Sequence, residues 1–140
     1  MSEENKACIA EFLDRVLSSG EISATDEYFH SDMVEEVPFP GQGPGLAGLK
    51  ETLAALRTAF PDMRWSIQEQ IAEDSRVLTR FVWEGTHQGN FLGIHPTNRA
   101  VSVWGMVIDQ FEGSKVKSTR ILMDTMGLMQ QLGALPMSPE

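Results

Sequence analysis

The period of the apolar residues changes once along this chain, and this change constrains the fold more than any other feature. In residues 3–18 and again in residues 48–60, apolar side chains recur every three to four positions, which predicts two amphipathic helices. From Trp65 onward they alternate with polar residues, as they do along a half-buried strand. Helices followed by a run of strands predict an α+β domain.

The strand-forming half divides into four runs, and two irregular segments stand out around them. A short helical piece is expected near Asp26–Phe29 and a final helix over 126–132. The segments HSDMVEEVPFPGQGPG and GTHQGNFLGIHPTNR are rich in Gly and Pro, so we expect loops there, the first with at most a short edge strand. Loops of this length are more often functional than idle. The four expected strands cover residues 65–71, 77–86, 100–111 and 116–124.

Length and composition limit the number of domains, the kinds of partner and the expected location. At 140 residues the chain is the size of one domain, which we place at residues 1–135 with a tail over 136–140. A net charge of −9 argues against binding to nucleic acid or to an anionic membrane surface. The start lacks a signal-peptide pattern, so the expected location is the cytoplasm. The single Cys8 and the absence of a Cys/His cluster predict neither a disulfide nor a metal site.

Four segments between about Tyr28 and Gly133 resemble the SnoaL-like polyketide cyclase family. They are HSDMVEEVPFPGQGPGLAGLKETL, AFPDMRW, GTHQGNFLGIHPTNR and MDTMGLMQQLG, in that order. The resemblance implies a cone-shaped α+β barrel, in which N-terminal helices pack on a curved, mainly antiparallel sheet that encloses an apolar pocket. It also implies a homodimer formed through the open face of the sheet, and a small aromatic or polyketide ligand.

The implied activity is tailoring of an aromatic polyketide by acid/base catalysis, with no cofactor. The family pattern places an acid/base Asp at the end of the last strand, which corresponds to Asp124. A carboxylate in an apolar cavity would have a raised pKa and could both take and return a proton in an aldol-type cyclisation or isomerisation. The alternative is that Asp124 only caps the helix that follows it.

Two further candidates for catalysis accompany Asp124. His87 stands where a strand enters the long loop, and it could polarise a carbonyl or serve as a structural hydrogen-bonding group. Arg120 stands where the family pattern usually has a tryptophan, and strand alternation would place Ser118, Arg120 and Asp124 on the cavity face. Arg120 could hold an anion or an enolate, form a buried ion pair with Glu35 or Glu36, or face an oligomer interface.

The remaining site predictions concern ligand contacts. We expect Trp104 to form a flat wall of the pocket and Trp65 to belong to the core. Two other functions remain open: a hydroxylase-type polyketide tailoring step, and a non-catalytic dimeric module that binds a small molecule. The residues expected to contact the ligand are Trp104, Trp83, Glu36, Phe39, Phe91, Met106 and Leu122.

Overall fold

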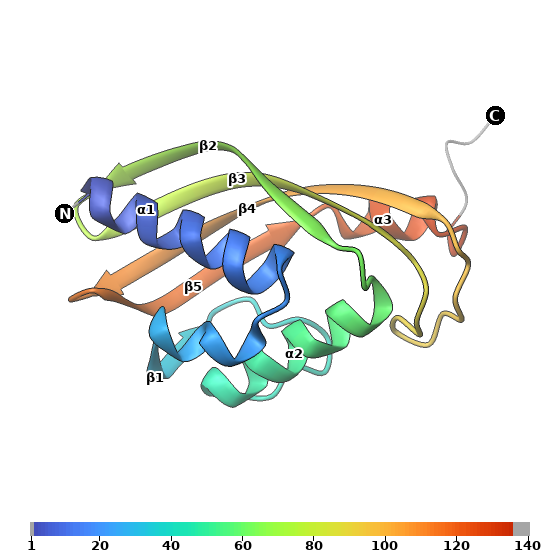
Figure 1. The fold of residues 1–140 in the computed structure, drawn as a ribbon, viewed down its shortest axis with the longest axis horizontal. Coiled ribbons are helices and arrows are strands. Elements are labelled where there is room, and N and C mark those ends of the chain that lie inside the picture. Colours follow the sequence, from blue (N-terminus) through green and yellow to red (C-terminus); the bar gives the residue numbers. More distant parts are fainter. Residues whose placement is uncertain (1, 136–140) are drawn as a thin grey trace.

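The computed structural model describes residues 2–135, and the predicted tail 136–140 lies outside them. Figure 1 shows helices packed on one face of a single curved sheet, so the predicted α+β class is confirmed. The helices are α1 (Ser2–Phe12), η1 (Leu13–Ser18), η2 (Ile22–Glu27), α2 (Gly45–Ala59) and α3 (Thr125–Gln131). The strands are β1 (Phe29–Glu35), β2 (Arg64–Glu73), β3 (Arg76–Thr86), β4 (Ala100–Glu112) and β5 (Lys115–Met123).

The sheet has five strands in the order β1-β5-β4-β3-β2. The four later strands pair antiparallel as consecutive neighbours, while β1 pairs parallel with β5. The expected edge strand therefore exists, but it makes the sheet mixed. The short helix expected near 26–29 lies earlier in the chain, as η2, because residues from Phe29 onward pair with β5.

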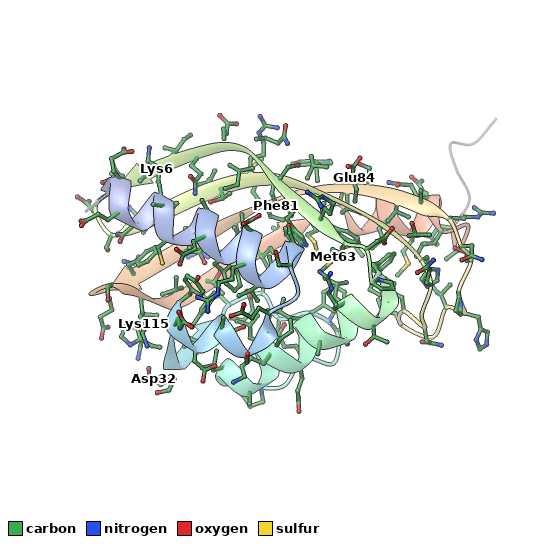
Figure 2. All side chains as sticks on the ribbon, in the orientation of Figure 1. Lys6, Asp32, Met63, Phe81, Glu84 and Lys115 are labelled. Atoms are coloured by element: carbon green, nitrogen blue, oxygen red, sulfur yellow. The ribbon has the colours of Figure 1, made fainter. Side chains whose placement is uncertain are left out.

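Alternation along β4 decides which side chains face the helices. Val101, Val103, Gly105 and Val107 are buried, whereas Ser102, Trp104 and Met106 between them are exposed. We call the face that packs against α1 and α2 the inner face and the opposite one the outer face. At Gly105 a Cβ atom would lie 2.7 Å from the ring of Phe81, so the glycine allows β3 to place that ring against β4. Figure 2 shows Phe81 between the sheet and the helices.

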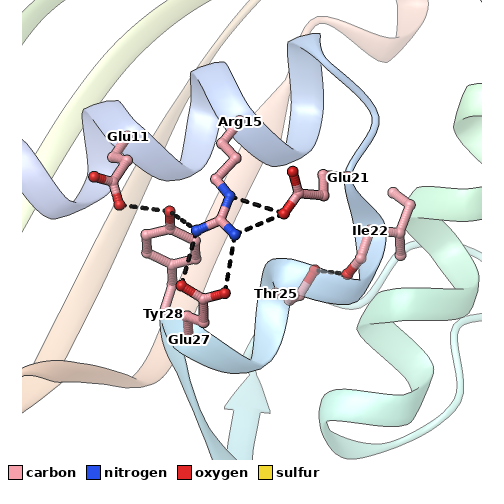
Figure 3. Close-up of polar contacts among 7 residues, drawn as sticks. All are labelled: Glu11, Arg15, Glu21, Ile22, Thr25, Glu27 and Tyr28. Atoms are coloured by element: carbon pink, nitrogen blue, oxygen red, sulfur yellow. Dashed lines mark hydrogen bonds and ion pairs between the residues drawn. The ribbon is translucent and has the colours of Figure 1, made fainter.

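The N-terminal helices are fixed to each other by a charged cluster around Arg15, drawn in Figure 3. The Arg15 guanidinium donates to Glu21 Oε2 at 2.6 Å and to Glu27 Oε1 at 2.8 Å, which ties η1 to η2. The hydroxyl of Tyr28 donates to Glu11 Oε1 at 2.6 Å and connects α1 to the start of β1. These contacts hold the helices over the inner face of the sheet.

Candidate functional site

A cavity of about 280 Å³ lies between the helices and the inner face of the sheet. Its walls come from α1, η1, α2, the loop between β1 and α2, and the inward residues of the strands. Most of these residues are apolar, among them Phe12, Leu53 and Phe81. A largely apolar cavity with a few polar groups is typical of a small-molecule site. The structure thus contains the kind of pocket that the sequence predicted.

Two carboxylates stand in this apolar wall. Asp109 points inward from β4 and is only 3% exposed. Its partner across the ladder is Thr119 of β5, which is in turn the partner of Glu35 at the end of β1. All three residues line the cavity. Three neighbouring strands therefore bring two acidic side chains to one part of the wall.

Burial raises the pKa of both carboxyl groups. For Asp109, burial and, to a smaller extent, the charge of Glu35 raise the pKa to about 7, although a hydrogen bond from Thr119 opposes the shift. For Glu35, burial raises the pKa to about 7, against backbone hydrogen bonds from Val37 and Ile121. The N–H of Val37 lies 3.1 Å from Glu35 Oε2. Near neutral pH each of these carboxyl groups can therefore carry a proton or release it.

Asp124 lies at the N-cap of α3. Its side chain accepts a hydrogen bond from the N–H of Gly127 at 2.9 Å, and its carbonyl accepts from Leu128 at 3.0 Å. Asp124 therefore caps α3, as the alternative to catalysis proposed. Asp124 does not line the cavity, and a catalytic role for it stays untested.

The prediction that Arg120 faces the cavity is wrong. Thr119 and Ile121 line the cavity, so alternation along β5 turns Arg120 to the outer face, where its side chain is 57% exposed. The predicted partner Glu36 is confirmed, with 3.4 Å between Nη2 of Arg120 and Oε1 of Glu36. The expected burial of this pair is wrong, because both side chains reach solvent. Neither residue lines the cavity.

His87 is fully buried but lies away from the cavity wall. Its Nδ1 accepts from the N–H of Thr97 at 3.2 Å and lies 3.0 Å from that residue's hydroxyl oxygen. Its backbone N–H donates to the carbonyl of Arg99 at 2.9 Å, and its ring centroid is 5.4 Å from that of Phe60. These contacts close the long loop 85–99. His87 is therefore placed as a structural hydrogen-bonding group, which was the alternative to a role in catalysis.

The prediction that Trp65 belongs to the core is confirmed, since it packs against both groups of buried residues, and it also lines the cavity. The prediction that Trp104 forms a wall of the pocket is wrong, because Trp104 lies on the outer face and is 49% exposed. Trp83 lies behind the wall, where its Nε1 donates to the sulfur of Met123 at 3.2 Å. Strand parity is the reason, because Val101 and Val103 point inward and Trp104 must therefore point outward.

The other predicted ligand contacts divide into two groups. Phe39 and Leu122 line the cavity. Phe91 lines an adjoining hollow and packs against Phe39, with 6.0 Å between the ring centroids. Met106 lies on the outer face, 39% exposed, so its prediction as a cavity residue is wrong for the same reason of parity.

Asp109 is the residue that sequence reasoning missed, and a signal for it was present. The inward positions of β4 are Val101, Val103, Gly105, Val107 and then Asp109. A carboxylate on the apolar face of a predicted strand must be paired or have its pKa raised. Glu35 offered a weaker signal, since its inward direction depends on the irregular register between β1 and β5.

Metal ligands and membrane-spanning helices are two further features that bear on function. Within residues 2–135, no three side chains of His, Cys, Asp or Glu are grouped so that they could hold a metal ion. Over the same residues, no helix combines the length and the apolar character needed to cross a membrane.

Comparisons with known proteins agree with this architecture. The model of the SnoaL-like polyketide cyclase family matches residues 7–132. AclR, a proposed hydroxylase from Streptomyces galilaeus, is 26% identical with a TM-score of 0.88, covering 100% of this chain and 87% of its own. A proposed polyketide cyclase from Acidithiobacillus ferrooxidans is 28% identical with a TM-score of 0.82, covering 93% and 94%. A search of curated proteins found no match.

Proposed function

Because the chain belongs to the SnoaL-like polyketide cyclase family, we propose that it is a polyketide tailoring enzyme that works by acid/base catalysis in its apolar cavity. The observation that carries this proposal is the pair of cavity carboxylates, Asp109 and Glu35. Family membership and the likeness to a proposed cyclase support the substrate class. The type of reaction is argued instead from the residues of the site, because one fold can carry many reactions.

In the proposed reaction, the ionised member of the pair removes a proton from the carbon next to a ligand carbonyl and so forms an enolate. In an aldol-type cyclisation the enolate carbon then bonds to a second carbonyl carbon of the same ligand, the π electrons of that carbonyl pass to its oxygen, and the protonated member gives a proton to the resulting alkoxide. In an isomerisation the proton returns instead to a different carbon of the enolate. Asp109 suits the role of base because the apolar wall destabilises its charge and so strengthens it as a proton acceptor. Glu35 suits the role of acid because its pKa is also raised to about 7.

This scheme combines proton transfers with bond formation inside the ligand and changes no net oxidation state, so we propose that the reaction needs no cofactor. Water must be excluded for the carboxyl groups to keep their raised pKa. The loop between β1 and α2 contributes Val37, Pro38, Phe39 and Pro40 to the wall, which shields the cavity on that side. The two prolines restrict the backbone of this loop.

A second candidate is a hydroxylase-type tailoring step. The likeness to AclR favours it, since that protein is a proposed hydroxylase and the alignment covers the whole of this chain. A carboxylate base could also remove a proton from an electron-rich phenolic ligand, so that the carbanion-like ring reacts with dioxygen; one oxygen atom stays on the ligand and the other leaves as water at the expense of an added two-electron reductant. The assay for this candidate is therefore run in air with a reductant present. The two candidates differ in the mass of the product, so one assay separates them.

The test is to incubate the protein with a panel of tricyclic and tetracyclic polyketide intermediates and to follow product mass. A product of unchanged mass and new retention time, lost in Asp109→Asn, is the expected result. A product heavier by one oxygen atom would support the hydroxylase candidate instead. Tight binding with no conversion by any variant would contradict both and leave a non-catalytic binding module. Asp124→Asn is the matched control, because it makes the same change to an Asp outside the cavity.

A further inference from the structure

The cavity wall contains two buried nitrogen donors that have no hydrogen-bond partner among residues 2–135. They are Nε2 of Gln42 and Nε1 of Trp65, and both residues line the cavity. Buried N–H groups in folded proteins are nearly always paired with protein or water, so each exception calls for an explanation. His87 Nε2 is also unpaired, but His87 lies away from the cavity wall. Two unpaired donors in one apolar cavity indicate that a ligand supplies the acceptors.

The amide of Gln42 is oriented by a tight turn in the loop between β1 and α2. Its Oε1 accepts from the N–H of Phe39 at 3.0 Å, and its own backbone N–H donates to the carbonyl of Phe39 at 2.8 Å. Because a backbone N–H can only donate, the oxygen end of the amide must face it. The NH₂ end is thereby turned away from the turn, as a donor with a fixed direction.

The indole of Trp65 is held in place by aromatic neighbours. Its ring centroid lies 4.6 Å from that of Phe81 and 6.0 Å from that of Trp83, with the two indoles nearly parallel at 20°. Its backbone is anchored as well, since the N–H of Trp65 donates to the hydroxyl oxygen of Ser18 at 2.8 Å. The neighbouring Trp83 has the same N–H group and gives it to Met123, so an unpaired indole is not general in this core.

We propose that Gln42 and Trp65 determine specificity by donating hydrogen bonds to carbonyl oxygens of the ligand that do not react. The inference rests on the proposed function for the use of the cavity and for the ligand class, and adds the two residues that orient the ligand. A carbonyl oxygen accepts two hydrogen bonds and brings no donor that the apolar wall would leave unpaired. An apolar hydrocarbon of the same shape would leave both donors without a partner, as they are among residues 2–135.

The register of the sheet separates these donors from the carboxylate pair. Trp65 of β2 stands opposite Trp83 of β3, whereas Asp109 of β4 stands opposite Val77, farther along the same strand. The ligand carbonyl bound by Trp65 is thus a different one from the carbonyl activated beside Asp109. Recognition of one oxygen at a distance from the reacting carbon would fix the orientation of the ligand in the cavity.

The test compares two probes that differ by a single carbonyl oxygen, 9-fluorenone and fluorene. Dissociation constants are measured by equilibrium dialysis for the wild type, Trp65→Phe, Gln42→Met and the double variant. We expect the wild type to prefer fluorenone, and the affinity for fluorenone to fall about 2- to 10-fold for each donor that the carbonyl reaches. The affinity for fluorene should stay within twofold, and the double variant should lose the preference.

Matched controls separate hydrogen bonding from packing. Trp104→Phe removes an indole N–H on the outer face, and Gln68→Met removes an exposed amide on β2. Both should leave the two affinities unchanged. An equal loss for fluorenone and fluorene in Trp65→Phe and Gln42→Met would overturn the proposal, as would a wild type that does not prefer the ketone. Asp109→Asn should keep the preference even where it abolishes turnover, so a failure of the proposed reaction is distinguishable from a failure of this inference.

Discussion

Both faces of the sheet carry acidic side chains, but the surroundings of these side chains are opposite on the two faces. On the inner face, Asp109 is buried in an apolar wall and its pKa is raised to about 7. On the outer face, Glu36 is exposed and pairs with Arg120. Water and an opposite charge stabilise a carboxylate, whereas an apolar wall makes it a stronger proton acceptor. Acid/base catalysis is therefore expected on the inner face, where the charge of a carboxylate is least stabilised.

The largest difference between the faces should appear in turnover. Asp109→Asn keeps the shape of the side chain but removes the proton acceptor, and we expect the rate of conversion to fall about 10²- to 10⁴-fold. Asp124→Asn should keep the rate within a few-fold, because asparagine caps a helix as well as aspartate does. A steady-state assay on the substrate found in the panel measures both. If the rate of conversion fell equally in Asp124→Asn and Asp109→Asn, the assignment of catalysis to the cavity carboxylate would be contradicted.

The next difference concerns stability against pH. Since the pKa of Asp109 is higher in the folded protein than the ordinary value of about 3.9, the folded state binds protons more tightly than the unfolded chain between pH 4 and 7. The free energy of unfolding should therefore fall as pH rises through this window, by about 4 kcal/mol from Asp109, of which about 3 kcal/mol falls between pH 5 and pH 8.

Urea unfolding at pH 5 and pH 8, at one protein concentration, measures that fall. Asp109→Asn should flatten the pH dependence, while the outer-face variant Arg120→Ala should retain the wild-type slope. Parallel curves for the wild type and Asp109→Asn would show that the buried carboxyl group does not hold its proton more tightly in the folded state.

A third comparison concerns the outer face alone. Trp104 and Ile71 expose 49% and 59% of their area there, and Met106 lies between them. We propose the homodimer expected from the family resemblance at this face. Trp104→Lys should weaken self-association by at least about 30-fold, as the loss of a central aromatic contact does at an interface. Sedimentation equilibrium checks it. A wild type that sediments as a monomer would contradict the proposal.

The smallest effect should come from the ion pair between Arg120 and Glu36. Both side chains are exposed, and exposed pairs contribute between about 0 and 1 kcal/mol. Arg120→Ala should therefore change the free energy of unfolding by less than about 1 kcal/mol and leave turnover unchanged. A clear fall in turnover in a variant that keeps its stability would indicate that Arg120 takes part in the reaction.

The fold was predictable because its signals are local. Apolar periodicity gave the long helices and the four antiparallel strands, and Pro61 marked the end of α2 to within two residues. The parallel edge strand β1 was harder to predict, since its pairing with β5 joins segments that are far apart in the sequence. Local pattern carries no information on that register.

The site was predicted less well because it depends on parity and on long-range pairing. The inward direction of Thr119 decides that of Arg120, and a one-residue error in parity reverses every assignment along the strand. Asp109 could have been found from its place among the inward valines of β4. Glu35 could not, because its inward direction depends on the register shift within β1.

The central claim is that Asp109 and Glu35 hold a proton at neutral pH. Infrared spectroscopy measures this directly, through the carbonyl stretching band of a protonated carboxylic acid. At pH 6 exposed carboxyl groups are ionised, so the wild type should show this band, the band should fade as pH rises through about 7, and Asp109→Asn should weaken or remove it. A wild-type spectrum without a protonated carboxyl band at pH 6 would contradict the claim.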